Sequence, residues 1–290
     1  MQLIAAAPFA LVALCLSRGV LSFNPQLATK FLRNALVSAS ISLSLASYSP
    51  PVLAASDAAP SASVLLSDTS VSAPRDEVSV YFGVGCFWHV QHEFVAAERS
   101  ILGRGDDQLT SRTGYAGGKS VGSIRFGEGV VKPAVCYHNL QGVADYGSLG
   151  HGEVVAMTVP KDKLSAFADE YFGLFGKDLE RPDKGDRGGE YRSLLGLPGG
   201  SNSPLFKEIS AAAEKKGLKL LDGKGNDADT LGKKAVWVMD SDAFPVYQAE
   251  LYHQFHDGFM PGEQYPEKYN ALRQAAMQRG LIARTGCPDI

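Results

Sequence analysis

The amino-acid sequence predicts an α+β domain: a two-layer α/β sandwich with a mixed sheet and extensive glycine-rich loops. Three observations support this class. Segments with the alternating pattern of strands and segments with helical spacing follow one another, but they do not form a long strand–helix alternation. Hydrophobic residues make up 45% of the 290 residues, which is enough for a substantial core. Many of the 31 glycines lie in stretches between the periodic segments.

Residues 1–56 have the composition of a targeting leader. They contain no Asp or Glu, and an apolar run at 3–16 has the length of a signal peptide. A second apolar segment at 35–46 precedes the small residues Ala54 and Ala55, as at a signal cleavage site. Two hydrophobic signals in series resemble the bipartite leaders of algae with complex plastids. We therefore expect a cleaved leader and a plastid location, with the thylakoid lumen as the final compartment; the secretory pathway or the mitochondrion is the alternative.

The rest of the chain divides into a linker and one domain. Residues 57–77 are rich in Ala and Ser and have little apolar periodicity, so we expect a linker. We expect a single catalytic domain over 78–290, with an extended C-terminal segment. The net charge of -3 and the absence of a Lys/Arg block argue against nucleic acid as a partner. After removal of the leader we expect no membrane anchor, and we expect a monomer.

The domain begins with a strand that leads directly into a helix. Alternating apolar residues predict a strand over 78–84. Helical spacing after it predicts a helix that starts at Cys86 and ends at Gly103, where a glycine can adopt a left-handed cap. Cys86 is therefore expected in the first turn of this helix.

Alternation of apolar residues and helical spacing also predict the remaining strands and helices. Ser203 can cap a helix whose first residue is Pro204, and Gly217 can end it. The order of the elements favours a mixed sheet over a long parallel one. The predicted elements are loops with short strands over 103–150, a strand over 154–159, a helix over 161–175, a charged glycine-rich loop over 176–200, a helix over 203–217, strands over 218–221 and 235–239, and a helix over 266–278.

The segment Gly85-Cys86-Phe87-Trp88 indicates a reactive thiol. The unpaired N–H groups and the positive end of the helix dipole favour thiolate over thiol, so we expect a lowered pKa for Cys86. Phe87 and Trp88 place aromatic surface next to this nucleophile. For this segment alone, a buried structural cysteine is the alternative.

Three glycine-rich segments carry titratable residues that can complete a site. Each residue alone has an ordinary explanation as a turn former, a core-edge aromatic or a solvated charge. The residues are Tyr115 in Gly-Tyr-Ala-Gly-Gly, Glu153 in Gly-His-Gly-Glu, and Asp186 and Tyr191 in Asp-Arg-Gly-Gly-Glu-Tyr-Arg-Ser.

In this combination and order, the motifs resemble those of the peptide methionine sulfoxide reductase A family. The family's Gly-Cys-Phe-Trp motif stands at 85–88, and its Gly-Tyr-x-Gly-Gly turn stands at 114–118. Its Gly-His-Ala-Glu and Asp-x-Gly-x-Gln-Tyr-Arg-Ser segments correspond to 150–153 and 186–193. A further segment at 249–255 is similar to the family's Ala-Glu-x-Tyr-His-Gln-x-Tyr. The resemblance thus spans most of the predicted domain.

The chain departs from the family's pattern in several places. Gly152 replaces the alanine, and Glu190 replaces the glutamine. The family's Asn-Pro-Thr-Tyr stretch is absent, and 120–139 is rearranged. The portion beyond Phe255 is longer than the family's glycine-rich tail. These changes fall on loops that shape access to the site, so they bear on peptide preference and on the resolving step.

The resemblance implies thiol-dependent reduction of the S epimer of peptide-bound or free methionine sulfoxide to methionine. Cys86 would attack the sulfoxide sulfur and be left as a sulfenic acid. Glu153 would donate the proton to the oxygen, which requires that burial raise the pKa of this carboxyl. The other implied roles are hydrogen bonding of the oxygen by Tyr115 and Tyr191, support of that network by Asp186, and apolar contact with the methyl group by Phe87 and Trp88.

The resemblance also implies a second thiol for turnover, and no metal or organic cofactor. The chain without its leader contains Cys86, Cys136 and Cys287. Cys287 lies near a glycine-containing C-terminus, so we expect it to be the resolving cysteine. Cys136 is expected to be a buried structural thiol. The implied partners are oxidised proteins or peptides as substrates, and thioredoxin or a similar dithiol as reductant.

Three alternatives remain open at this stage. A catalytically silent reductase-like protein would bind its partners without turnover. A cysteine hydrolase or acyltransferase would pair Cys86 with His151 as the base. A metal-binding module would use Cys86, His89 and His92 on successive helical turns, together with His151.

Overall fold

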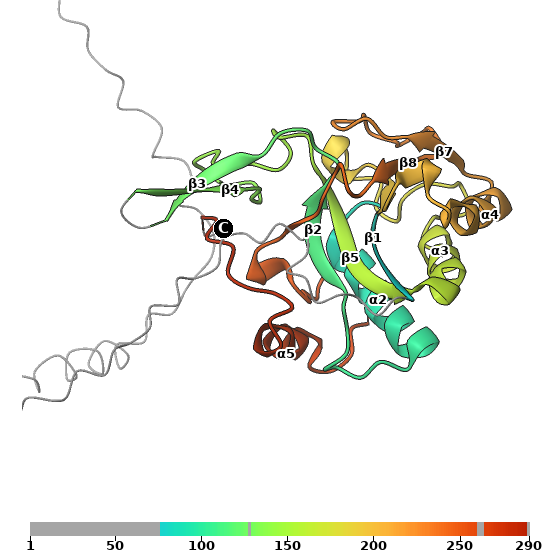
Figure 1. Cartoon of the computed structure of the whole chain (residues 1–290), viewed down its shortest axis with the longest axis horizontal. Helices are drawn as coiled ribbons and strands as arrows, with labels where there is room; N and C mark the ends of the chain where they lie inside the picture. Colours follow the sequence, from blue (N-terminus) through green and yellow to red (C-terminus); the bar gives the residue numbers. More distant parts are fainter. Residues whose placement is uncertain (1–75, 127–128, 260–263, 289–290) are drawn as a thin grey trace, which may run out of the picture. The chain divides into compact units, whose positions relative to one another are not determined.

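The computed structural model describes residues 76–126, 129–259 and 264–288 (Figure 1). The predicted leader at 1–56 and nearly all of the predicted linker at 57–77 lie outside the described residues. The described residues all belong to one structural unit.

The centre of the fold is a seven-stranded mixed sheet. Its strands are β1 (Glu77–Gly83), β2 (Arg112–Ala116), β5 (Gly152–Pro160), β6 (Leu194–Leu197), β7 (Lys219–Asp222), β8 (Ala235–Asp240) and β9 (Tyr247–Gln248). Their order across the sheet is β7-β8-β6-β1-β5-β2-β9. The pairs that involve β1 or β2 are antiparallel, whereas β8 runs parallel to both β6 and β7. The predicted α+β class with a mixed sheet is confirmed.

Three helices pack against one face of this sheet (Figure 1). They are α2 (Phe87–Leu102), α3 (Leu164–Gly173) and α4 (Phe206–Lys216). The main core lies between the two layers, where Phe82 of β1 stacks on Phe94 of α2 with ring centroids 5.0 Å apart. Phe167 of α3 stacks on Phe94 with ring centroids 6.3 Å apart, and all three rings are buried. Burial of these apolar faces holds the helices to the sheet.

The other face of the sheet is covered by loops. Tyr81 and Val154 belong to a second, smaller cluster there, and the Tyr81 hydroxyl donates a hydrogen bond to the backbone oxygen of Phe244 (3.0 Å). Helix α5 (Leu272–Gln278) packs with Phe255 against Val95 on α2. A separate hairpin of β3 (Gly122–Phe126) and β4 (Val130–Ala134) extends away from the sheet in Figure 1.

The structure corrects the predicted elements at several points. Strand β2 is one of the short strands expected within 103–150, although its bounds were not predicted. Strand β6 forms within the predicted 176–200 loop, and β9 forms from a segment that was not assigned. Strand β2 contains Gly114, although glycine has little strand propensity. A larger residue does not fit at this position, because a Cβ there would come within 2.6 Å of the Tyr247 oxygen on β9. Helix α4 begins at Phe206 and not at Ser203 as predicted, so Ser203 and Pro204 form the preceding turn.

The described residues include no helix that is both long and apolar enough to span a membrane.

Candidate active site

Cys86 lies at the junction between the central strand β1 and helix α2. It is the N-cap of the helix, one position before the predicted first turn, and its side chain is partly exposed. Gly85 has a positive φ of 81°, which turns the chain out of the strand at low steric cost. The Gly85 N–H donates a hydrogen bond to the backbone oxygen of Tyr191 (3.2 Å). The nucleophile is thus held between the sheet and the 186–193 loop.

The pKa of the Cys86 thiol is raised, not lowered as the sequence predicted. Burial is the main cause, and the charges of Glu153 and Asp186 add to it. The backbone N–H groups of Trp88 and His89 act on the sulfur in the predicted direction and lower the pKa. The effect of burial is larger, because the free energy lost when a thiolate is removed from water exceeds the free energy gained from hydrogen bonds to two N–H groups. In this state the thiol therefore retains its proton at neutral pH.

Glu153 lies on β5, the strand paired with β1, and its carboxyl reaches the start of α2. Oε2 accepts a hydrogen bond from the Phe87 N–H (2.9 Å), and Oε1 accepts one from the Tyr146 hydroxyl (3.2 Å). Its side chain is buried, with the residue 2% exposed. Burial raises the pKa of Glu153 to about 8, although both hydrogen bonds oppose this shift. A carboxylic acid that keeps its proton near pH 7 therefore lies next to the thiol.

Tyr146 is a site residue that the sequence analysis missed. Its hydroxyl bonds to Glu153 and also interacts with the hydroxyl of Tyr191, so the three side chains form one hydrogen-bonded row. Burial and the charge of Glu153 raise the pKa of Tyr191, which keeps its hydroxyl a donor. The sequence signal for Tyr146 is its position between Cys136 and the Gly-His-Gly-Glu segment.

Tyr115 takes a different place from the one expected. It pairs directly with Glu153 across β2 and β5, and its ring stacks on Tyr146 with centroids 4.6 Å apart. Its hydroxyl, however, donates a hydrogen bond to Oε2 of Glu250 (2.7 Å). The phenols that bond within the Glu153 row are therefore Tyr146 and Tyr191, and the Tyr115 hydroxyl is held by a second carboxyl.

Asp186 lies beside the turn that carries Cys86. A Cβ on Gly85 would be 3.6 Å from Asp186 Oδ2, and this oxygen is buried without a hydrogen-bond partner among the described residues. Burial and the charge of Asp183 raise the pKa of Asp186, while the Cys86 backbone N–H lowers it. The loop is anchored by the buried Arg181, which donates to the Asp186 backbone oxygen (3.0 Å). Asp186 thus contributes charge next to the thiol and helps to position its backbone.

The aromatic residues after Cys86 are fixed by a histidine. The Trp88 indole N–H donates to Nδ1 of His253 (3.2 Å), and the Phe87 ring is buried against the same imidazole, with centroids 5.2 Å apart. Burial lowers the pKa of His253 to about 3, so the imidazole is neutral and its proton lies on Nε2. The Tyr137 ring lies 4.3 Å from the imidazole. His253 stands in the matched segment at 249–255, which the sequence analysis left without a role.

A disulfide joins Cys136 to Cys287. The prediction that Cys136 is a lone structural thiol is wrong, and Cys287 is not a free thiol in this state. Cys86 is the free cysteine of the described residues. The disulfide lies close to the thiol site, because Tyr137 follows Cys136 directly and the charges of Cys86 and Glu153 both raise the pKa of Tyr137. The pairing was not predictable from spacing, because 151 residues separate the two cysteines.

The structure does not support His151 as the base that the hydrolase interpretation requires. His151 is 1% exposed, and both of its ring nitrogens bond to backbone. Nδ1 accepts from the Gly118 N–H (3.1 Å), and Nε2 lies 2.8 Å from the Ser120 oxygen. Burial lowers the pKa of His151 to about 4. This histidine therefore orders the loops around β5 and does not activate Cys86.

The metal-module interpretation is also not supported by the placement of its ligands. His92 bonds to the adjacent Glu93 carboxylate (3.0 Å). Within the part of the chain that the structure describes, the ligand atoms near enough to share an ion are those of Cys136, Glu250 and Cys287. Two of these are joined in the disulfide.

No protein-family model and no curated protein matches this chain. Similar solved structures include Mxr1 from Saccharomyces cerevisiae in reduced form, with 21% sequence identity and a TM-score of 0.41 over 67% of this chain and 93% of that chain. The same protein in an unusual oxidized form has 20% identity and a TM-score of 0.31, covering 67% and 91%. Methionine sulfoxide reductase A of Corynebacterium diphtheriae has 18% identity and a TM-score of 0.32, covering 67% and 82%. At these values the function must be argued from the chain's own site.

Proposed function

We propose that this protein reduces methionine sulfoxide to methionine with Cys86 as the nucleophile and Glu153 as the acid. The observation that carries the proposal is the hydrogen bond from the Phe87 N–H to the Glu153 carboxyl, which holds a carboxyl with a pKa of about 8 next to the Cys86 turn. A sulfoxide matches this pair. Its electrophilic sulfur takes a thiol nucleophile, and its oxygen must gain a proton before the S–O bond can break.

The proton inventory of the site fits this reaction. Glu153 donates its proton to the sulfoxide oxygen, and the resulting carboxylate takes the proton of the Cys86 thiol. The thiolate then attacks the sulfoxide sulfur, and the S–O bond breaks as the hydroxyl passes to the cysteine sulfur. The substrate sulfur is reduced by two electrons, and Cys86 is oxidised by two electrons to a sulfenic acid. The raised pKa of Cys86 is compatible with this order, since its proton leaves only after Glu153 has discharged its own.

The neighbouring side chains suit the same substrate. Tyr146 and Tyr191 place hydroxyl groups beside Glu153, where they can donate to the developing charge on the oxygen. Trp88 is partly exposed next to Cys86 and is held at a fixed angle by His253, so it offers an apolar surface to a methyl group. Substrate recognition by Trp88, and a finer preference for the S epimer, are parts of the proposal.

Turnover requires that the sulfenic acid be reduced. We assign this step to the Cys287 thiol, which displaces water from the sulfenic acid and forms a disulfide with Cys86. The Cys136 thiol then attacks Cys287 and releases Cys86, giving the Cys136–Cys287 disulfide that the structure contains. An external dithiol protein of the thioredoxin type would reduce this disulfide, so no organic cofactor is required. The proposed partners are oxidised proteins or peptides and this reductant.

The test is a turnover assay on the full-length chain with dithiothreitol and each epimer of a peptide methionine sulfoxide. We expect methionine from the S epimer, no product from Cys86→Ser, and a rate at least about 100-fold lower from Glu153→Gln. A wild-type chain that binds the peptide but forms no methionine would instead support the silent binding protein and overturn the proposal.

A further inference from the structure

The Cys136–Cys287 disulfide has a buried carboxyl as its neighbour. Sγ of each cysteine and a carboxylate oxygen of Glu250 all lie within 4.8 Å of one another. Glu250 is 8% exposed. Its two oxygens are held in place, because Oε2 accepts from the Tyr115 hydroxyl (2.7 Å) and Oε1 accepts from the Tyr137 N–H (2.9 Å). Sulfoxide reduction at Cys86 does not use this carboxyl, so its position beside two sulfurs calls for a separate explanation.

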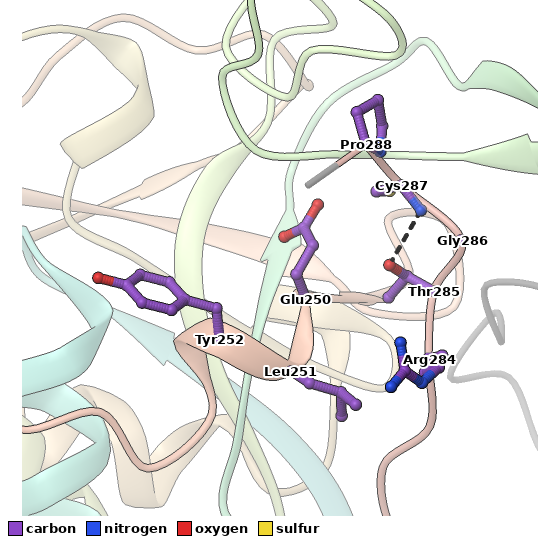
Figure 2. Close-up of a pocket in the computed structure, with 8 residues that line it drawn as sticks. All are labelled: Glu250, Leu251, Tyr252, Arg284, Thr285, Gly286, Cys287 and Pro288. Carbon is purple, nitrogen blue, oxygen red and sulfur yellow. Dashed lines mark hydrogen bonds between the residues drawn. The ribbon is translucent and has the colours of Figure 1, made fainter. Parts of the chain in front are cut away.

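Only one side of the disulfide is accessible. A pocket of about 440 Å³ is lined by Glu250, Tyr252 and the C-terminal segment from Arg284 to Pro288. Cys287 lines this pocket, whereas Cys136 is fully buried. Figure 2 shows the Glu250 carboxyl extending toward Cys287, while the Tyr252 ring points away from it. A thiol that enters the pocket therefore meets the Cys287 sulfur first, with the carboxyl of Glu250 beside it.

We propose that Glu250 is the proton donor and acceptor for the Cys136–Cys287 couple, and that an external dithiol opens this disulfide by attacking Cys287 through the pocket. The inference rests on the proposed function only for the use of a dithiol reductant. It adds a second catalytic carboxyl to the chain, separate from Glu153 and acting on a different pair of sulfurs.

The exchange balances as follows. A thiolate of the reductant attacks Sγ of Cys287, the Cys136–Cys287 bond breaks, and the leaving Cys136 sulfur takes the proton of Glu250. The Glu250 carboxylate then removes the proton from the second reductant thiol, which attacks the mixed disulfide and releases Cys287, and Cys287 is protonated from solvent. The reductant is oxidised to its disulfide by two electrons, and both cysteines become thiols. Glu250 ends in its initial protonation state.

The surroundings favour a protonated Glu250. Burial raises the pKa of this carboxyl, and the hydrogen bonds from Tyr115 and Tyr137 oppose that shift only in part. The pKa of the Tyr115 hydroxyl is itself raised well above its usual value by burial, so this group stays neutral. Arg284 is the cation that lines the same pocket. Protonation also matters for approach, because an ionised Glu250 would repel the incoming thiolate.

The experiment measures disulfide opening in the absence of any sulfoxide. The oxidised full-length chain carrying Cys86→Ser is mixed with dithiothreitol, quenched with an alkylating reagent, and scored by mass spectrometry for free Cys136 and Cys287. The Cys86→Ser background removes the sulfoxide chemistry, so failure of the proposed function cannot change this result. We expect Glu250→Gln to slow opening at pH 7 about tenfold, because general acid catalysis is lost. Glu214→Gln, the same substitution on an exposed residue of α4, is the control.

Whether Glu250→Gln slows or speeds disulfide opening distinguishes proton transfer by Glu250 from a purely electrostatic effect of its charge. If Glu250 acted only as a fixed charge, its neutralisation would speed the attack of a thiolate, and an equal or faster rate in Glu250→Gln overturns the proposal. The second readout requires no variant at position 250. The wild-type rate constant for disulfide opening is divided by the thiolate fraction of dithiothreitol at each pH. This ratio should fall as pH rises through the pKa of Glu250. A ratio that stays constant over pH 5–10 also overturns the proposal.

Discussion

Oε2 of Glu153 lies 2.9 Å from the backbone nitrogen of Phe87 and accepts its hydrogen bond. This one contact joins a carboxyl near the start of β5 to the first residue of the helix that follows Cys86. The N–H group is one of those that a helix leaves unpaired at its start, so Glu153 both satisfies the helix end and is oriented by it. A backbone group next to the nucleophile therefore helps to position the acid.

The pH dependence of the reaction follows from Glu153. Its acid form is required, and burial places its pKa at about 8, so kcat/KM for methionine sulfoxide should fall as pH rises through about 8. Steady-state rates from pH 6 to 10 test this. In Glu153→Gln the remaining activity should lack this alkaline fall, and a fall at the same pH in the variant would assign it to another group.

The same carboxyl should make stability depend on pH. The pKa of Glu153 is about 8 in the folded chain against an ordinary 4.5, so the folded state holds a proton that the unfolded state releases between these values. This stabilisation is complete below about pH 4.5 and is lost as pH rises through about 8. Relative to Glu153→Gln, the wild-type free energy of unfolding should fall from pH 5 to pH 9 by a few kcal/mol, at about 1.4 kcal/mol per pKa unit. Urea titrations at both pH values measure this difference, and parallel curves would contradict it.

Tyr146→Phe and Tyr115→Phe should differ in their effect on the pKa of Glu153, because only the Tyr146 hydroxyl bonds to that carboxyl. The Tyr146 hydrogen bond lowers the pKa of Glu153, so Tyr146→Phe should move the alkaline fall to higher pH and reduce kcat. Tyr115→Phe removes a bond to Glu250 instead, and the position of the fall should not change. A shift in the Tyr115 variant alone would restore the role that the sequence predicted for that residue.

Alkylation of Cys86 should reveal the charge of its neighbour. The ionised Glu153 raises the pKa of the thiol, and at pH 9 most Glu153 is ionised. Glu153→Gln should therefore react with iodoacetamide several-fold faster than wild type at pH 9, because a larger fraction of Cys86 is thiolate. Peptide mapping restricts the measurement to Cys86, and Glu214→Gln controls for net charge. Equal rates at pH 9 would show that the charge of Glu153 does not contribute to this pKa.

The sequence predicted the strand and helix around Cys86 because their periods are regular and Gly85 and Gly103 punctuate them. It could not assign the bounds of β2, and it predicted β6 as a loop. The glycines of both strands, Gly114 and Gly196, lie against residues that only the fold brings near. The hydrogen-bond partner of the Tyr115 hydroxyl could not be predicted for a similar reason. Register places its ring beside Glu153, but the partner of its hydroxyl comes from Glu250, far along the chain. The prediction of a lowered pKa for the Cys86 thiol was wrong, because burial depends on tertiary packing, which local spacing does not encode.

The position of β1 determines when the site can exist. Phe82 pairs with Val155 on one side and with Leu195 on the other, so the first strand of the sheet has no neighbour until chain far downstream has been synthesised. Pairings of this kind form late in folding. Until then Cys86 lacks the burial and the Glu153 carboxyl that raise the pKa of its thiol in the folded chain. A newly synthesised chain is therefore chemically unspecialised, and it acquires its site only in the step that completes the sheet.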